Sequence, residues 1–307
     1  MTKTRTPIGT YPTARKAHDA GLAVLAAGRP YWVYPTEHGE AHPEPAARFT
    51  LWVPTADADW LRQEVSFLGQ RNADWPPGPL KLPLKPAQLG PSLGVAALLI
   101  ALFIAQGQIP GLTERGLVSS EAIREHGELW RVITAVTLHG DLAHLVGNLA
   151  TLPVLGFFVG RYLGGGVAWL TILLLAALAN LTNALLGEAY DFRSLGASTA
   201  GFAALGLLAG VPAGWYLRLR KPLSPQEWIV PLIGGIALFI WLGGGGSPDG
   251  RTDIAGHLWA FLYGILAAIP LAAGFLGPHN HPRLQRSAWL LTTALLTVAF
   301  STQALLG

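Results

Sequence analysis

Apolar residues form long uninterrupted blocks over the last two thirds of the chain. After residue 85, seven windows of 19 to 29 residues contain no Asp, Glu, Lys or Arg. Because a helix of about 20 residues crosses a hydrocarbon core of roughly 30 Å, each window is long enough to span a membrane once. We therefore predict seven transmembrane helices, at 86–113, 142–160, 162–187, 194–217, 228–248, 254–282 and 287–307.

The N-terminal part is more polar. Residues 1–92 contain 10 of the 21 Lys and Arg and 8 of the 18 Asp and Glu, which is typical of a small water-soluble domain. Hydrophobic periodicity and turn residues predict a small α+β domain over residues 1–74. Its elements are a helix at 13–27, strands at 31–35 and 48–53, and a helix at 55–65 with Thr55 as N-cap.

Six prolines between Trp75 and Ser92 disfavour helix and sheet alike. We therefore expect a linker at 75–92 and a transmembrane domain at 93–307. The first residues lack the apolar core of a signal peptide, so we expect the N-terminus to remain on the side where it is synthesised.

Composition supports a membrane protein and excludes several chemistries. Charged residues make up 13% of the chain, about half of the roughly 25% that is usual in soluble domains. The absence of cysteine excludes disulfides, thiol nucleophiles and cysteine-based zinc sites. A net charge of +3 without a basic stripe argues against a nucleic-acid partner. No HExxH motif is present, and we expect neither a metal nor a cofactor.

The charges between the windows predict the orientation. With the N-terminal domain inside, the inner loops contain six basic residues and one acid, whereas the outer loops contain five basic residues and nine acids. Lys81 and Lys85 add to the inner side. The positive-inside rule therefore favours an inner N-terminus and an outer C-terminus.

Four polar residues lie within the predicted spans: His144, Asn148, Ser198 and His257. Each is close to the start of the second, fourth or sixth window. Since pairs of crossings separate these windows, all three start on the same, outer face. Polar groups inside spans are costly and usually functional, so the sequence predicts one shallow site on that face.

A serine hydroxyl needs a base within hydrogen-bond reach, and His257 is the candidate base for Ser198. His144 and Asn148 are spaced i and i+4, so both can direct hydrogen-bond donors at one point, as an oxyanion requires. Taken singly, Ser198 is better explained by close helix packing. His257 and the His144–Asn148 pair are about equally well explained by interhelical hydrogen bonds.

Taken together, these residues resemble the rhomboid family of intramembrane serine proteases over roughly residues 91–307. The resemblance rests on five short motifs. They are Trp130-Arg131, His139, His144-x-x-x-Asn148, Gly196-x-Ser198, and Ala255-Gly256-His257 through Gly264.

The resemblance implies that Ser198 is the nucleophile and His257 the general base, and that His144, Asn148 and the Ser198 N–H form the oxyanion hole. It implies a multi-pass protein that cleaves single-span membrane proteins within the lipid bilayer, for which a bacterial plasma (inner) membrane is the simplest location. The chain departs from the family pattern at Thr199, Phe202 and Ala260, which affects packing and pocket shape more than the dyad.

Two other classes of function stay open. One is a catalytically silent rhomboid-like protein that binds membrane clients, which the presence of both Ser198 and His257 disfavours. The other is a small transporter, which the absence of an internal repeat disfavours.

Overall fold

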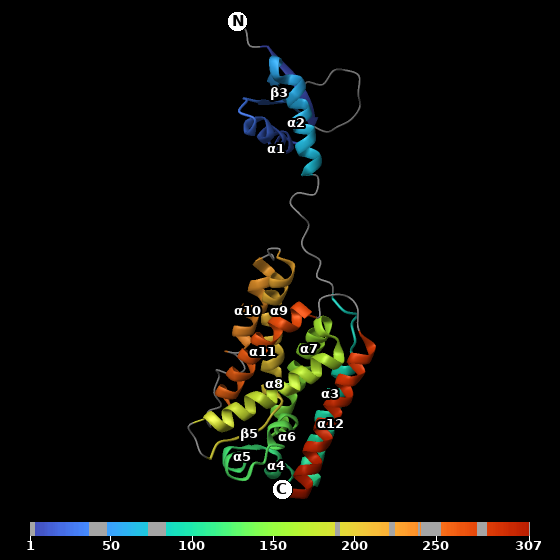
Figure 1. Cartoon of the computed structure of the whole chain (residues 1–307), viewed down its shortest axis with the longest axis vertical. Coiled ribbons are helices and arrows are strands. Elements are labelled where there is room, and N and C mark those ends of the chain that lie inside the picture. Colours follow the sequence, from blue (N-terminus) through green and yellow to red (C-terminus); the bar gives the residue numbers. More distant parts are fainter. Residues whose placement is uncertain are drawn as a thin grey trace. The chain divides into compact units, whose positions relative to one another are not determined.

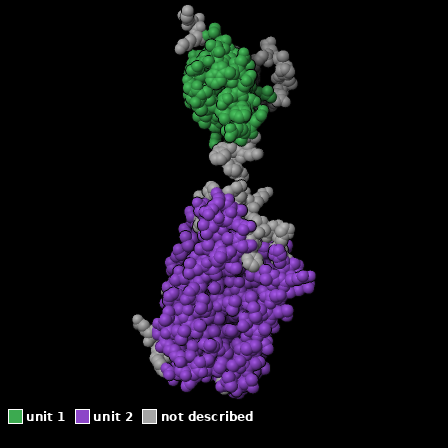
Figure 2. Space-filling model, in the orientation of Figure 1, with its two compact units in different colours: residues 1–80 green, residues 81–307 purple. Residues whose placement is uncertain are grey.

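The structure is a computed structural model that describes residues 4–36, 48–72, 84–187, 191–220, 225–238, 240, 253–274 and 281–306. The chain divides into two compact units, residues 1–80 and 81–307 (Figure 2).

Unit 1 is a three-stranded antiparallel sheet of order β1-β3-β2, accompanied by two helices. Val24 of the first helix, Leu51 and Val53 of the central strand, and Leu61 of the second helix form its core and are inaccessible to solvent. The elements are β1 (Arg5–Tyr11), α1 (Ala14–Ala26), β2 (Trp32–Pro35), β3 (Phe49–Pro54), η1 (Thr55–Asp57) and α2 (Ala58–Arg71).

The predicted small α+β domain is thus present, with two differences. Strand β1 was missed, because Pro7 and Gly9 interrupt its apolar pattern, and its pairing with β3 is irregular at those residues. Thr55 does not cap the second helix. It begins the short helix η1, and its hydroxyl accepts a hydrogen bond from Thr6.

Unit 2 is a bundle of long apolar helices (Figure 1). Six helices among the described residues are long and apolar enough to span a membrane. They are α3 (Gly90–Gln108), α7 (Leu142–Leu163), α8 (Gly165–Leu186), α9 (Ser198–Leu219), α11 (Ile254–Gly274) and α12 (Pro282–Leu306). The prediction of a helical membrane bundle beside a small α+β domain is confirmed.

The fifth predicted span, 228–248, is described only in part. Helix α10 (Pro225–Leu238) covers its first half, and residues 239 and 241–248 lie outside the described residues. A seventh crossing therefore stays a prediction. The expected linker at 75–92 also differs from the structure, because α3 begins at Gly90 with a proline in its first turn, where the missing N–H costs nothing. Residues 75–83 of that linker are outside the described residues.

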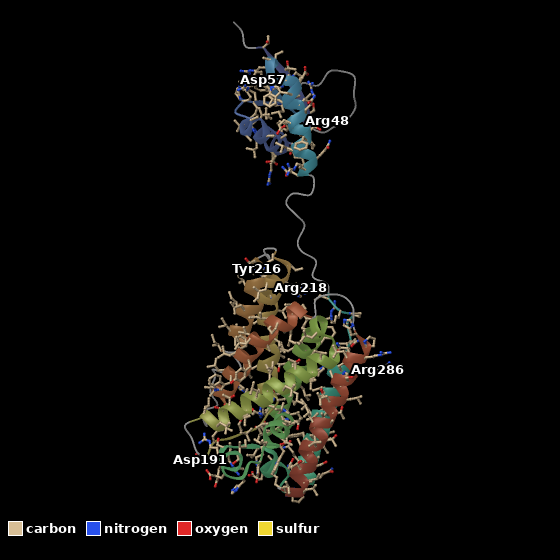
Figure 3. All side chains as sticks on the ribbon, in the orientation of Figure 1. Arg48, Asp57, Asp191, Tyr216, Arg218 and Arg286 are labelled. Carbon is tan, nitrogen blue, oxygen red and sulfur yellow. The ribbon has the colours of Figure 1, made fainter. Side chains whose placement is uncertain are left out.

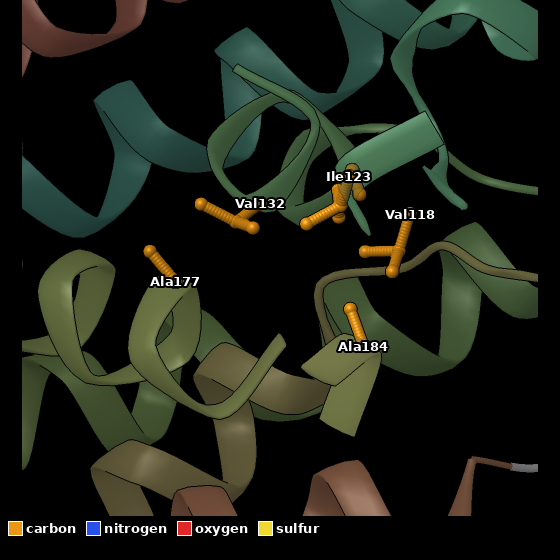
Figure 4. Packing of buried hydrophobic residues seen from close by; sticks show 6 residues of the cluster. Val118, Ile123, Val132, Ala177 and Ala184 are labelled. Atoms are coloured by element: carbon orange, nitrogen blue, oxygen red, sulfur yellow. The ribbon is translucent and has the colours of Figure 1, made fainter. Parts of the chain in front are cut away.

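The connection between α3 and α7, residues 109–141, is folded rather than extended. It contains α4 (Leu112–Gly116), β4 (Val118–Ser119), α5 (Ser120–His126), α6 (Arg131–Thr134) and η2 (Ala135–Thr137). Figure 4 shows its side chains Val118, Ile123 and Val132 facing Ala177 and Ala184 of α8, with which they form one buried cluster.

Buried polar contacts also fix this connection. The Arg131 side chain is 10% exposed, and its guanidinium donates hydrogen bonds to the carbonyls of Glu114 and Leu117. The Trp130 indole donates to the Arg115 carbonyl at 3.1 Å. The Trp130-Arg131 pair therefore stabilises the connection from within.

Helices α9 and α11 pack with their backbones in contact. A Cβ atom placed on Gly206, Gly210 or Gly214 of α9 would lie 2.1 to 2.5 Å from a carbonyl oxygen of α11. Those carbonyls belong to Phe261, Ile265 and Ile269, a constant offset of 55 residues. The two helices therefore run parallel and in register, and any larger side chain on this face would separate them.

We expect Gly210→Ala to destabilise unit 2 by about 1–3 kcal/mol, because the added methyl would meet the Ile265 backbone and the Ala268 methyl group. Thermal unfolding in detergent micelles measures the effect. Gly201→Ala on the same helix is the matched control, since a Cβ there meets nothing within 4 Å. Equal unfolding temperatures for the two variants would contradict backbone-limited packing.

Candidate active site

Ser198 and His257 meet at the start of α9 and α11. The Ser198 Oγ atom lies 2.7 Å from His257 Nε2, which is hydrogen-bond distance. Ser198 is the first residue of α9, and His257 lies in the first turn of α11. The parallel register of these helices brings the hydroxyl and the imidazole together although 59 residues separate them.

The imidazole of His257 is held from one side by Phe202. The two ring centroids are 4.4 Å apart with an interplanar angle of 31°. His257 is 5% exposed, and its Nδ1 atom has no hydrogen-bond partner among the described residues. Phe202, one of the departures from the family pattern, thus supplies an aromatic ring against the imidazole. Ala260, another departure from the family pattern, packs in the same buried cluster.

Asp253 caps the first turn of α11. Its Oδ1 atom accepts hydrogen bonds from the Gly256 N–H at 2.8 Å and from the Asn183 amide of α8 at 2.7 Å. Its backbone carbonyl accepts from the His257 N–H. Burial raises the pKa of the Asp253 carboxyl, an effect opposed by the hydrogen bonds from Gly256, Ser194 and Asn183. This residue thus fixes the turn that carries the imidazole.

His144 approaches the same point from α7. Asp141 caps that helix and accepts from the His144 N–H at 2.8 Å. Gly196 leaves room for the imidazole, because a Cβ there would lie 2.6 Å from His144 Nε2, and its φ of +135° also favours glycine. The Gly196 N–H donates to the Ala135 carbonyl, so the 109–141 connection supports this turn.

His139 lies behind His144. The two rings are perpendicular in arrangement, with centroids 5.3 Å apart. The backbone of His139 exchanges two hydrogen bonds with the Gln106 side chain of α3. Burial, together with the His144 ring, lowers the pKa of His139 from 6.5 to about 4. A neutral imidazole therefore packs against the ring that faces Ser198.

Asn148, one turn after His144, is 6% exposed, and its Nδ2 atom is buried without a hydrogen-bond partner among the described residues. His144, Asn148, Ser198 and His257 all line one cavity of about 780 Å³. The structure thus brings together all four residues that the sequence predicts. Unsatisfied buried donors are rare, and an amide in this position is free to bind an oxygen in the cavity.

Sequence reasoning missed Asp253 and Asn183. The signal for Asp253 was its place as the last charged residue before the sixth window, where an acidic N-cap is favoured. No pattern in the sequence pairs it with Asn183, which lies 70 residues earlier. Among the described residues, no group of three or more His, Asp and Glu side chains could hold a metal ion.

The fold and the site define a class: a multi-pass helical membrane protein with a hydroxyl–imidazole pair in a cavity at helix starts. Residues 126–274 match the family model described as the rhomboid domain. Together with the relatives given below, this match supports a protein of the rhomboid family.

The curated relatives carry rhomboid names. RHOMBOID-like protein 5 of Arabidopsis thaliana is 27% identical over 179 residues, which cover 57% of this chain and 55% of the relative. Rhomboid protease GluP of Bacillus subtilis is 31% identical over 148 residues, 47% of this chain and 26% of the relative. Rhomboid-like protease 3 of Toxoplasma gondii is 32% identical over 139 residues, which cover 45% of this chain and 50% of the relative. The chain thus spans about half the length of two of these relatives and about a quarter of the third.

We expect the stability of unit 2 to fall as the pH falls from about 6.5 to about 4, in part because of His139. In this range the unfolded chain binds a proton that the folded chain excludes, so acid favours unfolding. His139→Phe removes that proton site and should reduce the loss of unfolding temperature between neutral pH and about pH 5. His126→Gln, which removes an exposed imidazole, is the matched control. An unchanged pH dependence in His139→Phe would contradict the lowered pKa.

We expect Asp253→Ala to lower the free energy of unfolding by about 0.5–2 kcal/mol, because the first turn of α11 loses its cap. Asp253→Asn keeps the Oδ1 acceptor and avoids the cost of a buried carboxylate, so it should be at least as stable as the wild type. Chemical or thermal unfolding in micelles measures both. If Asp253→Asn and Asp253→Ala lower the free energy of unfolding equally, Asp253 does not act as a helix cap.

Proposed function

We propose that this chain is an intramembrane serine endopeptidase that hydrolyses peptide bonds in or near the transmembrane segments of single-span membrane proteins. The single observation that carries the proposal is the 2.7 Å contact between Ser198 Oγ and His257 Nε2 in a cavity. Membership of the rhomboid family and relatives named as proteases support the same activity.

In the proposed reaction, His257 Nε2 takes the proton of the Ser198 hydroxyl as Oγ attacks the scissile carbonyl carbon. The C–N bond then breaks, and the same imidazole returns the proton to the leaving amine. A water molecule, deprotonated by His257, hydrolyses the acyl-enzyme and regenerates Ser198. Because Nδ1 of His257 has no partner among the described residues, the Phe202 ring, rather than an acidic third member, orients the imidazole.

The negative charge on the carbonyl oxygen needs donors that are already in place. Asn148 Nδ2 is buried and unpartnered, and His144 lies one turn earlier on the same helix. The Ser198 N–H belongs to the first turn of α9, where N–H groups have no intrahelical acceptor and the helix dipole favours an anion. We assign these three groups to the oxyanion hole.

The arrangement in the membrane is part of the proposal. Ser198 and His257 both lie at helix starts, so the chemistry takes place close to one face of the bilayer. Basic residues concentrate near the other ends of these helices, which the positive-inside rule assigns to the cytoplasm. We therefore place the cavity at the outer face of a plasma (inner) membrane and the domain at 1–74 in the cytoplasm.

We expect Ser198→Ala and His257→Ala to abolish cleavage of a single-span substrate in proteoliposomes, and Asn148→Ala to lower the rate by about 10²-fold or more. Wild type, but not Ser198→Ala, should also react with a fluorophosphonate probe. Ser301→Ala removes an exposed hydroxyl from α12 and is the matched control. Near-wild-type turnover in either dyad variant refutes the mechanism. Inactive wild type with several substrates would favour a client-binding protein instead.

A further inference from the structure

A second hollow lies between α3 and α12, outside the candidate active site. It is a groove of about 800 Å³ with an apolar lining, which we call the α3–α12 groove. Its walls include Gly90, Gly94 and Leu98 of α3 and Trp289, Leu296 and Phe300 of α12. A Cβ atom on Gly90 or Gly94 would meet nothing within 4 Å, so the glycines leave this space open.

The groove faces the surroundings of the bundle. Of the six candidate spans, α3 and α12 have the smallest buried shares, 11% and 17%. The lining runs from Gly90 to Leu102 on α3, which is about 18 Å along a helix. Half of a hydrocarbon core of roughly 30 Å is about 15 Å. The groove therefore has the depth of one leaflet and matches the reach of one acyl chain.

The two helices start at the same end of the groove. A Cβ atom placed on Gly165 would lie 2.8 Å from Pro91 of α3, and one on the next residue, Gly166, would lie 2.1 Å from the Gln285 carbonyl oxygen of α12. Neither helix has an acidic residue in its first turn, so both positive dipole ends are uncompensated by side chains there. This end is therefore favourable for an anion.

Basic side chains surround that end. Arg283 and Arg286 are exposed in the first turns of α12, directly before Trp289 of the lining, and no ion pair involves either of them within the described part of the chain. Arg161 precedes Gly165, which approaches Pro91 of the lining, by four residues, and its Nε atom is buried without a partner among the described residues. Figure 3 shows Arg286 on the side of unit 2 that is opposite Asp191.

Acidic side chains are concentrated at the other end. Apart from Glu227 of α10, the described Asp and Glu residues of unit 2 lie in the 109–141 connection, at Asp191 and at Asp253. The groove thus combines a leaflet-deep apolar channel with an unneutralised cationic mouth. A basic pocket between transmembrane helices on the side with excess Lys and Arg is suited to an anionic lipid headgroup.

We propose that the α3–α12 groove binds one anionic phospholipid, with an acyl chain between α3 and α12 and the phosphate at Arg283 and Arg286. Trp289 lies at the level where the chain meets the headgroup, a depth that tryptophan favours. The binding is reversible and involves no covalent step. It adds a lipid site that is separate from the candidate active site.

A second copy of the chain is a poorer occupant. A symmetric dimer through this groove would place the Arg283 and Arg286 pairs of two copies at the same depth, where like charges repel. An anionic headgroup instead neutralises them. Charge therefore favours lipid over self-association.

The experiment is native mass spectrometry of the full chain in detergent, titrated with phosphatidylglycerol or with phosphatidylcholine. We expect one phosphatidylglycerol to stay bound at concentrations where phosphatidylcholine dissociates. Arg283→Gln with Arg286→Gln should weaken phosphatidylglycerol binding by about tenfold or more. Gly94→Leu fills the apolar channel without a backbone clash and should weaken the binding of both lipids.

The matched control is Arg218→Gln with Arg220→Gln, which removes the same charge at the end of α9, away from the groove. It should bind phosphatidylglycerol like the wild type. If both double variants lost the same affinity for phosphatidylglycerol, the lipid would be attracted by the general surface potential, and the proposed site would be wrong. Phosphatidylcholine binding as tight as phosphatidylglycerol binding, or unchanged binding in Gly94→Leu, would also overturn the site. A dimer that Gly94→Leu dissociates would identify a second copy as the occupant instead.

Discussion

The backbone contact between α9 and α11 is the constraint on which the site depends. Three glycines of α9, each one turn from the next, meet carbonyl groups of α11 at a constant offset of 55 residues. Continued by one turn, the same offset pairs Phe202 with His257, whose rings are indeed in contact. Ser198 is one turn further, within reach of the imidazole. The register of the two helices thus sets the positions from which the Ser198 and His257 side chains extend, and side-chain motion cannot alter that register.

The other half of the cavity depends on the 109–141 connection. Its strand β4 pairs with β5 (Arg193–Ser194), and Ala135 accepts from the Gly196 N–H, so the turn before Ser198 is held from outside the bundle. This support keeps Gly196 in its positive-φ conformation beside the His144 ring. For the proposed reaction this matters, because donors that are fixed before substrate binds need no reorganisation, which is the condition for strong oxyanion stabilisation.

The sequence predicted the parts of this structure that follow from local pattern. Charge-free windows predicted the six candidate spanning helices that the structure describes, and helix parity predicted that His144, Asn148, Ser198 and His257 lie close together, as they do in one cavity. Contacts between distant residues could not be predicted from the sequence. The pairing of β1 with β3 and the hydrogen bond from Asn183 to Asp253 are two examples. Trp130 and Arg131 were recognised as a motif, yet apart from the ion pair of Arg131 with Glu128 their partners are backbone carbonyls, which no side-chain pattern reveals.

The helices of unit 2 differ in burial in a way that explains where polarity is tolerated. The candidate nucleophile begins α9. In the most apolar 18-residue window of this helix 78% is buried, and its mean hydropathy, 1.4, is the lowest of the six candidate spans. Surrounded by other helices, α9 can carry a hydroxyl and close-packed glycines without exposing either to lipid. The outer helices α3 and α12 contact the surroundings along most of their length. Glycines there serve a different purpose, because Gly94 opens space toward the membrane whereas Gly210 closes it against α11. The same small residue therefore provides rigidity at the site and a recess at the periphery, according to what lies opposite.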